Sequence, residues 1–514
     1  MPITKRFRGR YGMAVAIALL GLCPNIVLST AFLPVSRVIS RDLGASALQL
    51  GLAEGLSNAG YAFGAVLAAQ LAQRYVQRRL FLWFEALFVV GSVLAAVAPG
   101  IGLFFAGRLL QGSATGFMLI SALPPLVTRF GVGKLPGTVA IVNIGLFGAS
   151  TLGPLVGGVT AALGSWRLLL VVVALLGAAG FGVALLGYVE FDPPAPDLPI
   201  DKTALSLALA ATVLPFFATS MLSGASMSAP VFLIPFLLGL IALVALVVVQ
   251  YRKANPLMPV RALSTQLPVT GTVVAMLAGA VFVTVLELTQ LYLVEVAGQS
   301  PLGANLQFWP MPLGLLVAAV VFGLLVRTRY LALLVLAGLL ALGAGAALLV
   351  PLSPTGTGTV VTTASLLLGF GAGATVSPGL FLAAFGVPAS RLGRAFALVE
   401  LLRSEAAYAV TPVVVFLAEA LPTLASGIRV GLLAMVALAG VGLVAALAIP
   451  LFSGARLRKP DLEAWLEDGE QALASPTTVA HLRPRVEDEV VEPLLPRNLP
   501  RPPRPRRPRR RRRP

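Results

Sequence analysis

The chain has 514 residues, of which 57% are apolar and 11% charged, and its mean hydropathy is +0.91. Soluble domains carry about 25% charged residues, so this composition excludes ordinary soluble domains and indicates a surface that lies mostly in lipid. One cysteine (Cys23) and one histidine (His481) leave too few ligands for a zinc or similar metal centre. We therefore expect no metal, no cofactor and no enzyme active site.

Fourteen apolar runs are each long enough to cross about 30 Å of hydrocarbon as a helix. They cover 11–34, 48–70, 80–99, 101–125, 138–163, 168–189, 203–222, 229–251, 267–294, 303–326, 330–350, 358–384, 395–419 and 428–452. The first run continues past Cys23, so we interpret it as a spanning helix and not as a signal peptide. The chain is thus predicted to be an all-α integral membrane protein.

The distribution of Lys and Arg predicts how these helices are oriented. With the N-terminus in the cytoplasm, the inner segments hold seventeen basic residues, and the outer loops hold Arg37, Arg41, Arg167 and Arg429. Basic residues gather on the cytoplasmic side of membrane proteins. Both termini are therefore predicted to be cytoplasmic, in the plasma membrane or a bacterial inner membrane.

The residues after the last apolar run differ sharply in composition from the rest. Residues 460–472 can form a short helix, whereas 496–514 consist almost entirely of Arg and Pro, which predicts a disordered polycation. We expect this tail to rest on anionic lipid headgroups. Nucleic-acid binding is not expected, because no aromatic residues alternate with the arginines.

A polar motif interrupts the fourth apolar run. Arg108, Gln111 and Gly112 stand within the small-residue stretch 107–116. An arginine inside an apolar helix is costly unless it faces a cavity or a partner. The small residues around it allow another helix to pack closely.

The fifth apolar run is rich in glycine. It carries Gly145, Gly148, Gly153, Pro154, Gly157 and Gly158, and Trp166 and Arg167 follow. Glycines at this spacing with a proline among them predict a groove and a pliable point, and tight helix packing alone would also explain them.

Together these two segments resemble the major facilitator superfamily, specifically its fourteen-helix drug:proton antiporter branch. The helix 4 segment looks like that family's RxxQG motif, and the helix 5 segment with its Trp-Arg pair is similar to the GPxxGG antiporter motif. In helix 13, Gly393 and Arg403 also resemble the family pattern, and Glu400 can pair with Arg403 three residues away. The resemblance covers about residues 11–452.

This resemblance implies two six-helix bundles around a central cavity, with two further helices inserted between them. The expected parts are a cytoplasmic N-tail at 1–10, a bundle at 11–189, inserted helices at 203–251, a second bundle at 267–452 and the disordered tail at 453–514. In transporters built from such repeats the substrate site lies near the bilayer midplane. Arg108 is then expected beside the coupling site and the helix 5 glycines at the bundle interface.

Two positions depart from the family pattern. Asn25 stands where the resemblance implies an acidic residue in helix 1. In the loop after helix 2, Gln73 replaces the expected aspartate, although Arg74 and Arg78 are present. The aspartate is expected to tie this loop to a neighbouring helix end as a gating latch, so the sequence predicts a weaker latch here.

Buried acids elsewhere could take over proton binding. The intramembrane candidates are Glu54, Glu85, Glu287, Glu400 and Glu405. Glu405 lies about 15 Å into helix 13, near the midplane, where a carboxyl group suits proton binding and release. A structural ion pair or a polar contact between helices would equally explain these residues.

The resemblance implies a secondary transporter that exports small amphipathic or cationic molecules in exchange for protons, and we expect a monomer. Two alternatives remain. One is a facilitator of the same fold that moves a metabolite or lipid without protons. The other is a non-transporting membrane sensor or scaffold that acts through its basic tail.

Overall fold

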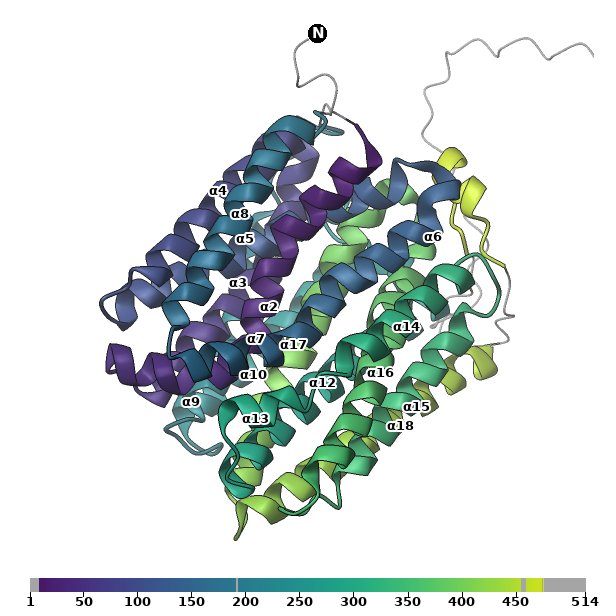
Figure 1. Cartoon of the computed structure of the whole chain (residues 1–514). Coiled ribbons are helices and arrows are strands. Elements are labelled where there is room, and N and C mark those ends of the chain that lie inside the picture. Colours follow the sequence, from purple (N-terminus) through teal and green to yellow (C-terminus); the bar gives the residue numbers. More distant parts are fainter. Residues whose placement is uncertain (1–8, 191–192, 454–458, 474, 476–514) are drawn as a thin grey trace, which may run out of the picture. The chain divides into compact units, whose positions relative to one another are not determined.

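The protein is described here by a computed structural model that covers residues 9–190, 193–453, 459–473 and 475. Every regular element in these ranges is a helix. The first part of the chain forms α2 (Tyr11–Leu43), α3 (Ala47–Arg74), α4 (Gln77–Ala96), α5 (Ile101–Thr128), α6 (Gly131–Val142), the π-helical turn η1 (Asn143–Phe147), α7 (Gly148–Leu163) and α8 (Trp166–Gly187). These elements pack on one another as the first bundle (Figure 1).

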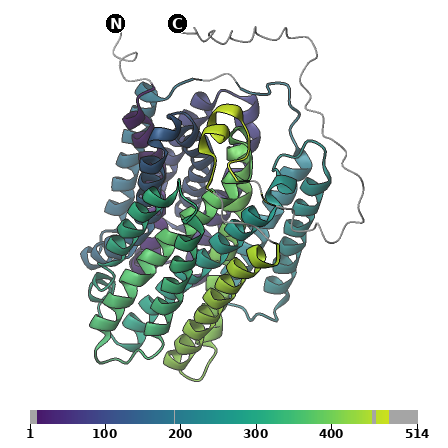
Figure 2. The same ribbon diagram turned by 90° about the vertical axis from the view of Figure 1, so that its right-hand side faces the viewer.

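Two helices follow and then a second bundle. The helices α9 (Lys202–Met221) and α10 (Pro230–Arg252) pack against each other, and α9 also contacts α3. The second bundle comprises α12 (Gln266–Leu291), η2 (Tyr292–Val296), α13 (Pro301–Leu306), α14 (Met311–Leu325), α15 (Leu331–Leu349), α16 (Thr357–Phe385), η3 (Ala389–Arg391), α17 (Leu392–Glu419) and α18 (Leu424–Ser453), preceded by the short α11 (Val260–Leu263). Figure 2 shows α9 and α10, in teal at its right, beside the other helices.

Thirteen spans in the described ranges are long and apolar enough to cross a membrane. The fourteenth predicted span, α3, has 28 residues but carries polar side chains such as Glu54 and Asn58 along its length. It lies between α5, α9 and α17. A Cβ on Gly112 of α5 would stand 1.9 Å from the Ser57 carbonyl oxygen, so α3 and α5 touch backbone to backbone. Protein therefore replaces lipid around α3.

The span predicted as one helix at 303–326 is broken in the structure. It consists of α13 and α14, with turns at 307–310 between them. Pro310 explains the break, because proline has no N–H to donate and disfavours the helical conformation of the residue before it.

The two bundles meet along two seams. On one seam α6 and α7 contact α14, and α7 also contacts α13. On the other, α17 contacts α3 and α5. We call the end of the bundles at which α2 begins the near end, and the end at the turn after Leu43 the far end; the near end is predicted to be cytoplasmic.

Residues 459–473 correct the prediction of a wholly disordered tail. They fold against the second bundle near its near end, where they are drawn in yellow (Figures 1 and 2). The expected short helix is present as a helical turn that includes η4 (Ala464–Asp468). Trp465 is fully buried, and its indole N–H donates to the Val387 carbonyl oxygen at 2.9 Å. Residues 1–8 and 476–514, including the Arg-Pro stretch, lie outside the described residues.

Candidate functional site

A cavity of about 680 Å³ lies among α2, α3, α9, α12 and α17. All of its lining residues belong to the far half of these helices, from Ser29 to Arg41 on α2 and from Tyr408 to Glu419 on α17, for example. Aromatic side chains line it beside polar ones, namely Phe32, Phe216, Tyr408 and Phe416. The cavity has the size and mixed lining of a small-molecule site.

Three carboxylates reach this cavity. They are Glu54 of α3, Glu287 of α12 and Glu419 of α17, and Glu287 lies within electrostatic reach of the other two. Arg37 and Arg41 of α2 also line it, at the far end. Arg37 pairs with Glu295 of η2, which joins the two bundles at the cavity mouth.

Glu54 is tied to the buried arginine that the sequence singled out. The Nη2 atom of Arg108 donates to Glu54 Oε2 at 2.5 Å, and the side chain of Arg108 is 1% exposed against 18% for Glu54. Arg108 Nη1 donates to Gln111 Oε1 at 2.8 Å, and Gln111 donates to Ser92. The RxxQG residues thus form one hydrogen-bonded chain whose outer member is a carboxylate facing the cavity.

Further polar groups surround the Glu54 carboxylate. The Ser29 hydroxyl of α2 donates to Glu54 Oε1 at 2.9 Å, and the Asn58 amide approaches the same oxygen at 3.4 Å. The Tyr408 side chain of α17 lies beside Ser29. Glu54 therefore contacts its own bundle directly and the second bundle through Ser29.

A second charged cluster joins the bundles on the near side of the cavity. Glu400 and Arg403 of α17 form an ion pair one helical turn apart. The Tyr61 hydroxyl of α3 donates to Glu400 Oε1 at 2.7 Å. Glu400 and Tyr61 are both buried.

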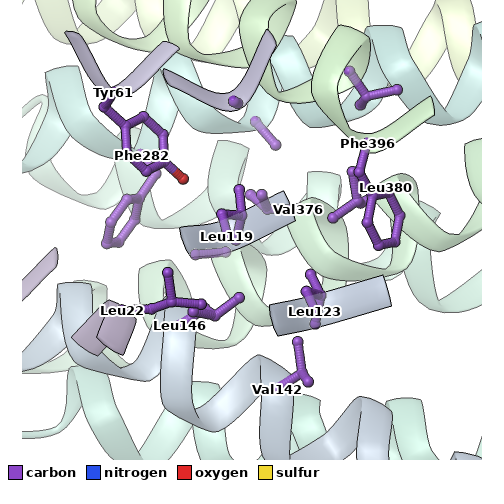
Figure 3. Packing of buried hydrophobic residues seen from close by; sticks show 14 of the residues in the cluster. Leu22, Tyr61, Leu119, Leu123, Val142, Leu146, Phe282, Val376, Leu380 and Phe396 are labelled. Carbon is purple, nitrogen blue, oxygen red and sulfur yellow. The ribbon is translucent and has the colours of Figure 1, made fainter. Parts of the chain in front are cut away.

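Apolar side chains close the near half of the bundle interface. Leu119 and Leu123 of α5 and Leu146 of η1 pack in one cluster with Val376 of α16 and Phe396 of α17 (Figure 3). The Asn143 amide adds a hydrogen bond from the first bundle to the Gly373 carbonyl oxygen at 2.8 Å. The structure thus has its cavity in the far half of the helices and a packed interface in the near half.

Three predicted polar residues lie away from this cavity. Glu405 is 7% exposed, does not line the cavity, and its Oε1 has no hydrogen-bond partner in the described part of the chain. Glu85 is fully buried between Gly21 of α2 and Gly180 of α8, and neither of its carboxylate oxygens has a described partner. Asn25 is buried as well, and its Oδ1 is without a described partner.

The glycine-rich motif of the fifth predicted span, which lies in η1 and α7, packs on helices of both bundles. A Cβ on Gly145, Gly153 or Gly157 would meet Leu19, Thr30 or Ala31 of α2, all within the first bundle. On Gly158 it would lie 2.7 Å from Asn305 of α13, and on Gly148 it would lie 3.3 Å from Leu315 of α14. Pro154 is buried within α7. The arrangement places two of the motif glycines at the bundle seam and three within the first bundle.

The residues that follow this motif, Trp166 and Arg167, hold the far end of α2. The Trp166 indole N–H donates to Asp42 Oδ2 at 2.8 Å, and Arg167 pairs with the same carboxylate. Arg167 also donates to the Ala98 carbonyl oxygen at 3.1 Å. This cluster fastens α2 to α8 within the first bundle.

The loop after α3 makes contacts within the first bundle. The Gln73 amide donates back to the Ala69 carbonyl oxygen of its own helix at 2.7 Å. Arg74 lies over the neighbouring Tyr75 ring, and Arg78 donates to the Leu185 carbonyl oxygen at 3.0 Å. None of these described contacts reaches the second bundle.

Sequence reasoning did not identify Ser29, Asn58, Tyr61 or Tyr408. For α3 a signal was present, because Glu54, Asn58 and Tyr61 follow one another at spacings of four and three residues and therefore share one helix face. For Tyr408 and Ser29 the contact depends on which helices become neighbours.

Comparison with known proteins yields one matching family model. The model of the Major Facilitator Superfamily matches residues 18–412. Among solved structures, a POT family transporter covers 88% of this chain and 99% of its own, with a TM-score of 0.62 and 15% identity. The human organic anion transporter MFSD10 covers 85% and 100%, with a TM-score of 0.60 and 15% identity. These structures show the same fold.

Curated relatives match over parts of the chain. The Multidrug resistance protein B homolog of Mycobacterium tuberculosis is 30% identical over 303 residues, which are 58% of this chain and 53% of that protein. The Drug efflux pump JefA of the same organism is 29% identical over 361 residues, 67% of this chain and 69% of the pump. The uncharacterized MFS-type transporter YubD of Bacillus subtilis is 25% identical, over 54% of each chain. The chain thus spans about half the length of the first of its curated relatives.

Proposed function

The chain belongs to the Major Facilitator Superfamily, as a multi-pass transporter of the cell membrane, and we propose that it exports small amphipathic or cationic molecules in exchange for protons. The observation that carries this proposal is a carboxylate at the cavity, Glu54, paired with the buried Arg108. An ionisable residue in a membrane span that faces a cavity is a functional-site hypothesis by default.

The Glu54–Arg108 pair is suited to exchanging a proton for a cation. A proton from the far side that binds Glu54 removes its negative charge and with it the attraction for Arg108 and for any cation in the cavity. Loss of that proton on the near side restores the negative charge of Glu54 and its attraction for Arg108 and for a cation. Glu54 thus holds either a proton or the electrostatic attraction for a cation, which is the requirement for exchange.

Glu287 is our candidate for contact with the substrate. It lines the same cavity, and no basic partner is found for it among the described residues. A cation in the cavity would neutralise its charge, and the aromatic rings of Phe216 and Tyr408 would cover an apolar body. The names of two relatives, a multidrug resistance protein and a drug efflux pump, support the export of drugs.

The test is export of a fluorescent lipophilic cation from cells that express the chain, with and without an uncoupler. Wild type is expected to export the dye, and the uncoupler is expected to stop it. Glu54→Gln keeps the shape of the side chain but can no longer exchange a proton. It should abolish uphill export while leaving downhill dye exchange across proteoliposomes.

Glu419→Gln is the matched control, because it also removes one negative charge from the cavity but acts on an exposed side chain at the mouth. It should keep most uphill export. Export that persists with the uncoupler and in Glu54→Gln would overturn proton coupling. That result would favour a facilitator of a metabolite or lipid, which the missing acids at Asn25 and Gln73 also favour.

A further inference from the structure

The loop after α3 carries no charged latch in this chain. Gln73 stands at the latch position, and its amide is occupied by its own helix through the Ala69 carbonyl oxygen. Yet the near half of the bundle interface is closed. A contact between α3 and α17 can add to the apolar packing that holds that closure.

Such a contact exists deeper in the same two helices. The Tyr61 hydroxyl on α3 donates to Glu400 on α17, and Arg403 donates to the same carboxylate through Nε at 3.0 Å. The Glu400 side chain is 4% exposed and that of Arg403 11%. A hydrogen bond to a buried charged group is stronger than one between neutral groups.

Separation of α3 from α17 would break this cluster asymmetrically. Arg403 stays with Glu400 because both belong to α17, whereas Tyr61 leaves with α3. The carboxylate would lose one donor and the buried hydroxyl its acceptor, and each group left unpaired costs free energy unless water replaces the partner. The hydrogen bond therefore favours the closed near end.

The position of Tyr61 also connects this cluster with the proton-binding candidate. Glu54, Asn58 and Tyr61 lie on one face of α3, and Asn58 approaches the Glu54 carboxylate. A shift of α3 that accompanies a change at Glu54 would move Tyr61 by a similar amount, because a helix moves as one body.

We propose that the Tyr61–Glu400–Arg403 cluster is the latch that holds the near end closed, in place of the loop after α3. This inference rests on the proposed function in one respect, namely that the transporter opens its cavity to the two sides of the membrane in turn (alternating access), and on neither its cargo nor its protons. Tyr61 and Glu400 are positioning residues here: they set the balance between the two ends and need not touch the substrate.

The test measures which end is open, on purified protein in detergent without substrate or gradient. In a Cys23→Ser background, Val376→Cys reports on the near interface, where Val376 is 4% exposed, and Ser36→Cys reports on the cavity. The rate of labelling by a hydrophilic maleimide is measured at each reporter. Tyr61→Phe removes only the hydroxyl and should speed labelling at the near reporter about tenfold, the size expected for one hydrogen bond to a charged group.

The matched control is Tyr188→Phe. Tyr188 is also buried, and its hydroxyl donates to the Ser121 carbonyl oxygen at 2.6 Å, but both residues belong to the first bundle. It should leave both labelling rates unchanged. Size-exclusion profiles establish that each variant is folded, and Glu400→Gln serves as a second variant that weakens the same bond by removing the charge.

Two results would overturn the latch. One is a near reporter that labels at the parental rate in both Tyr61→Phe and Glu400→Gln. The other is an equal acceleration in Tyr188→Phe, which would assign the effect to general loosening. Neither substrate nor gradient is present in this experiment. Either result would therefore say nothing about the proposed export, which the dye assay tests separately.

Discussion

Glu54 and Glu287 face the same cavity, but their partners differ. Glu54 is held by Arg108, Ser29 and Asn58, whereas Glu287 has two neighbouring carboxylates and no described basic partner. An arginine-paired carboxylate keeps its place when the cavity is empty. A carboxylate without such a partner attracts a cation. The two residues are thus suited to different tasks in one site.

Glu287→Gln tests this division at the level of one side chain. We expect export of a permanently charged dye to fall at least about tenfold, since one lost ionic contact of about 1.4 kcal/mol has that effect. A neutral amphipathic substrate should be exported at nearly the wild-type rate. Transport assays with both probes check the prediction, and an equal loss for both would assign Glu287 a structural role instead.

Residue types and spacings predicted part of this site from the sequence. Arg108, Gln111 and the candidate Glu54 are visible in the sequence because charged and strongly polar residues inside apolar runs are rare. Depth along the helix suggested Glu405, yet the structure places it off the cavity. The depth of a residue in the membrane follows from the rise per residue along the helix. The direction of its side chain depends on how the helix is rotated about its axis, and a sequence that is apolar on all sides does not predict that rotation.

At the scale of elements, the inserted pair α9 and α10 is fastened to α3 through Asp201. The Asp201 backbone N–H donates to Gln70 of α3, and its carboxylate accepts from Gln250 and Lys253 of the α10 end, the latter at 2.8 Å. The apolar runs predicted that these helices exist. They did not predict this anchor, which depends on residues about 50 positions apart meeting at one end.

The Asp201 anchor predicts a pH-dependent stability. Burial raises the pKa of this carboxyl group, but hydrogen bonds from Lys253, Ala204 and Gln250 outweigh burial and lower the pKa below its ordinary value. Its contribution is therefore present above about pH 4, the pKa of an unfolded aspartate, and is lost as the pH falls through the lower folded pKa. Asp201→Asn should lower the melting temperature at pH 7, with a difference that shrinks at pH 3.

The exposed Asp197, in the segment between α8 and α9, supplies the control. Its variant is Asp197→Asn, because no hydrogen bond of its side chain to a helix is described. Thermal unfolding of both variants in detergent at the two pH values gives the comparison. A deficit for Asp201→Asn that is equally large at pH 3 would contradict the electrostatic explanation.

At the scale of the whole molecule, the segment at 459–473 and 475 is part of the folded transporter. Trp465 contacts Phe385 edge to face at 5.2 Å between ring centres, and the Leu473 N–H donates to the Phe385 carbonyl oxygen at 3.0 Å. Composition predicted a solvated tail, since charged residues surround this stretch. The docking depends on one tryptophan, Trp465, which packs into a site on the second bundle. Amino-acid composition does not predict such a specific contact.

Truncation separates a transporter from a scaffold. Removal of 476–514 should leave export and thermal stability unchanged, because none of the described docking contacts is lost. Trp465→Ala should destabilise the second bundle by about 3–5 kcal/mol, the usual cost of emptying a buried tryptophan site. Dye export and thermal unfolding measure the two effects. Loss of all function in the truncation alone would support a scaffold that acts through its basic tail.

The polar composition of α3 has a consequence for how the protein is made. A helix that carries Glu54, Asn58 and Gln70 partitions poorly into lipid on its own, because each polar side chain must give up its water. Its main partner, α5, follows only after α4 has been synthesised. During synthesis α3 must therefore stay in a hydrated or protein-lined setting until Arg108 arrives. The charge pair at the cavity then belongs to the first helix contact that covers α3, and α9 and α17 cover its other faces later.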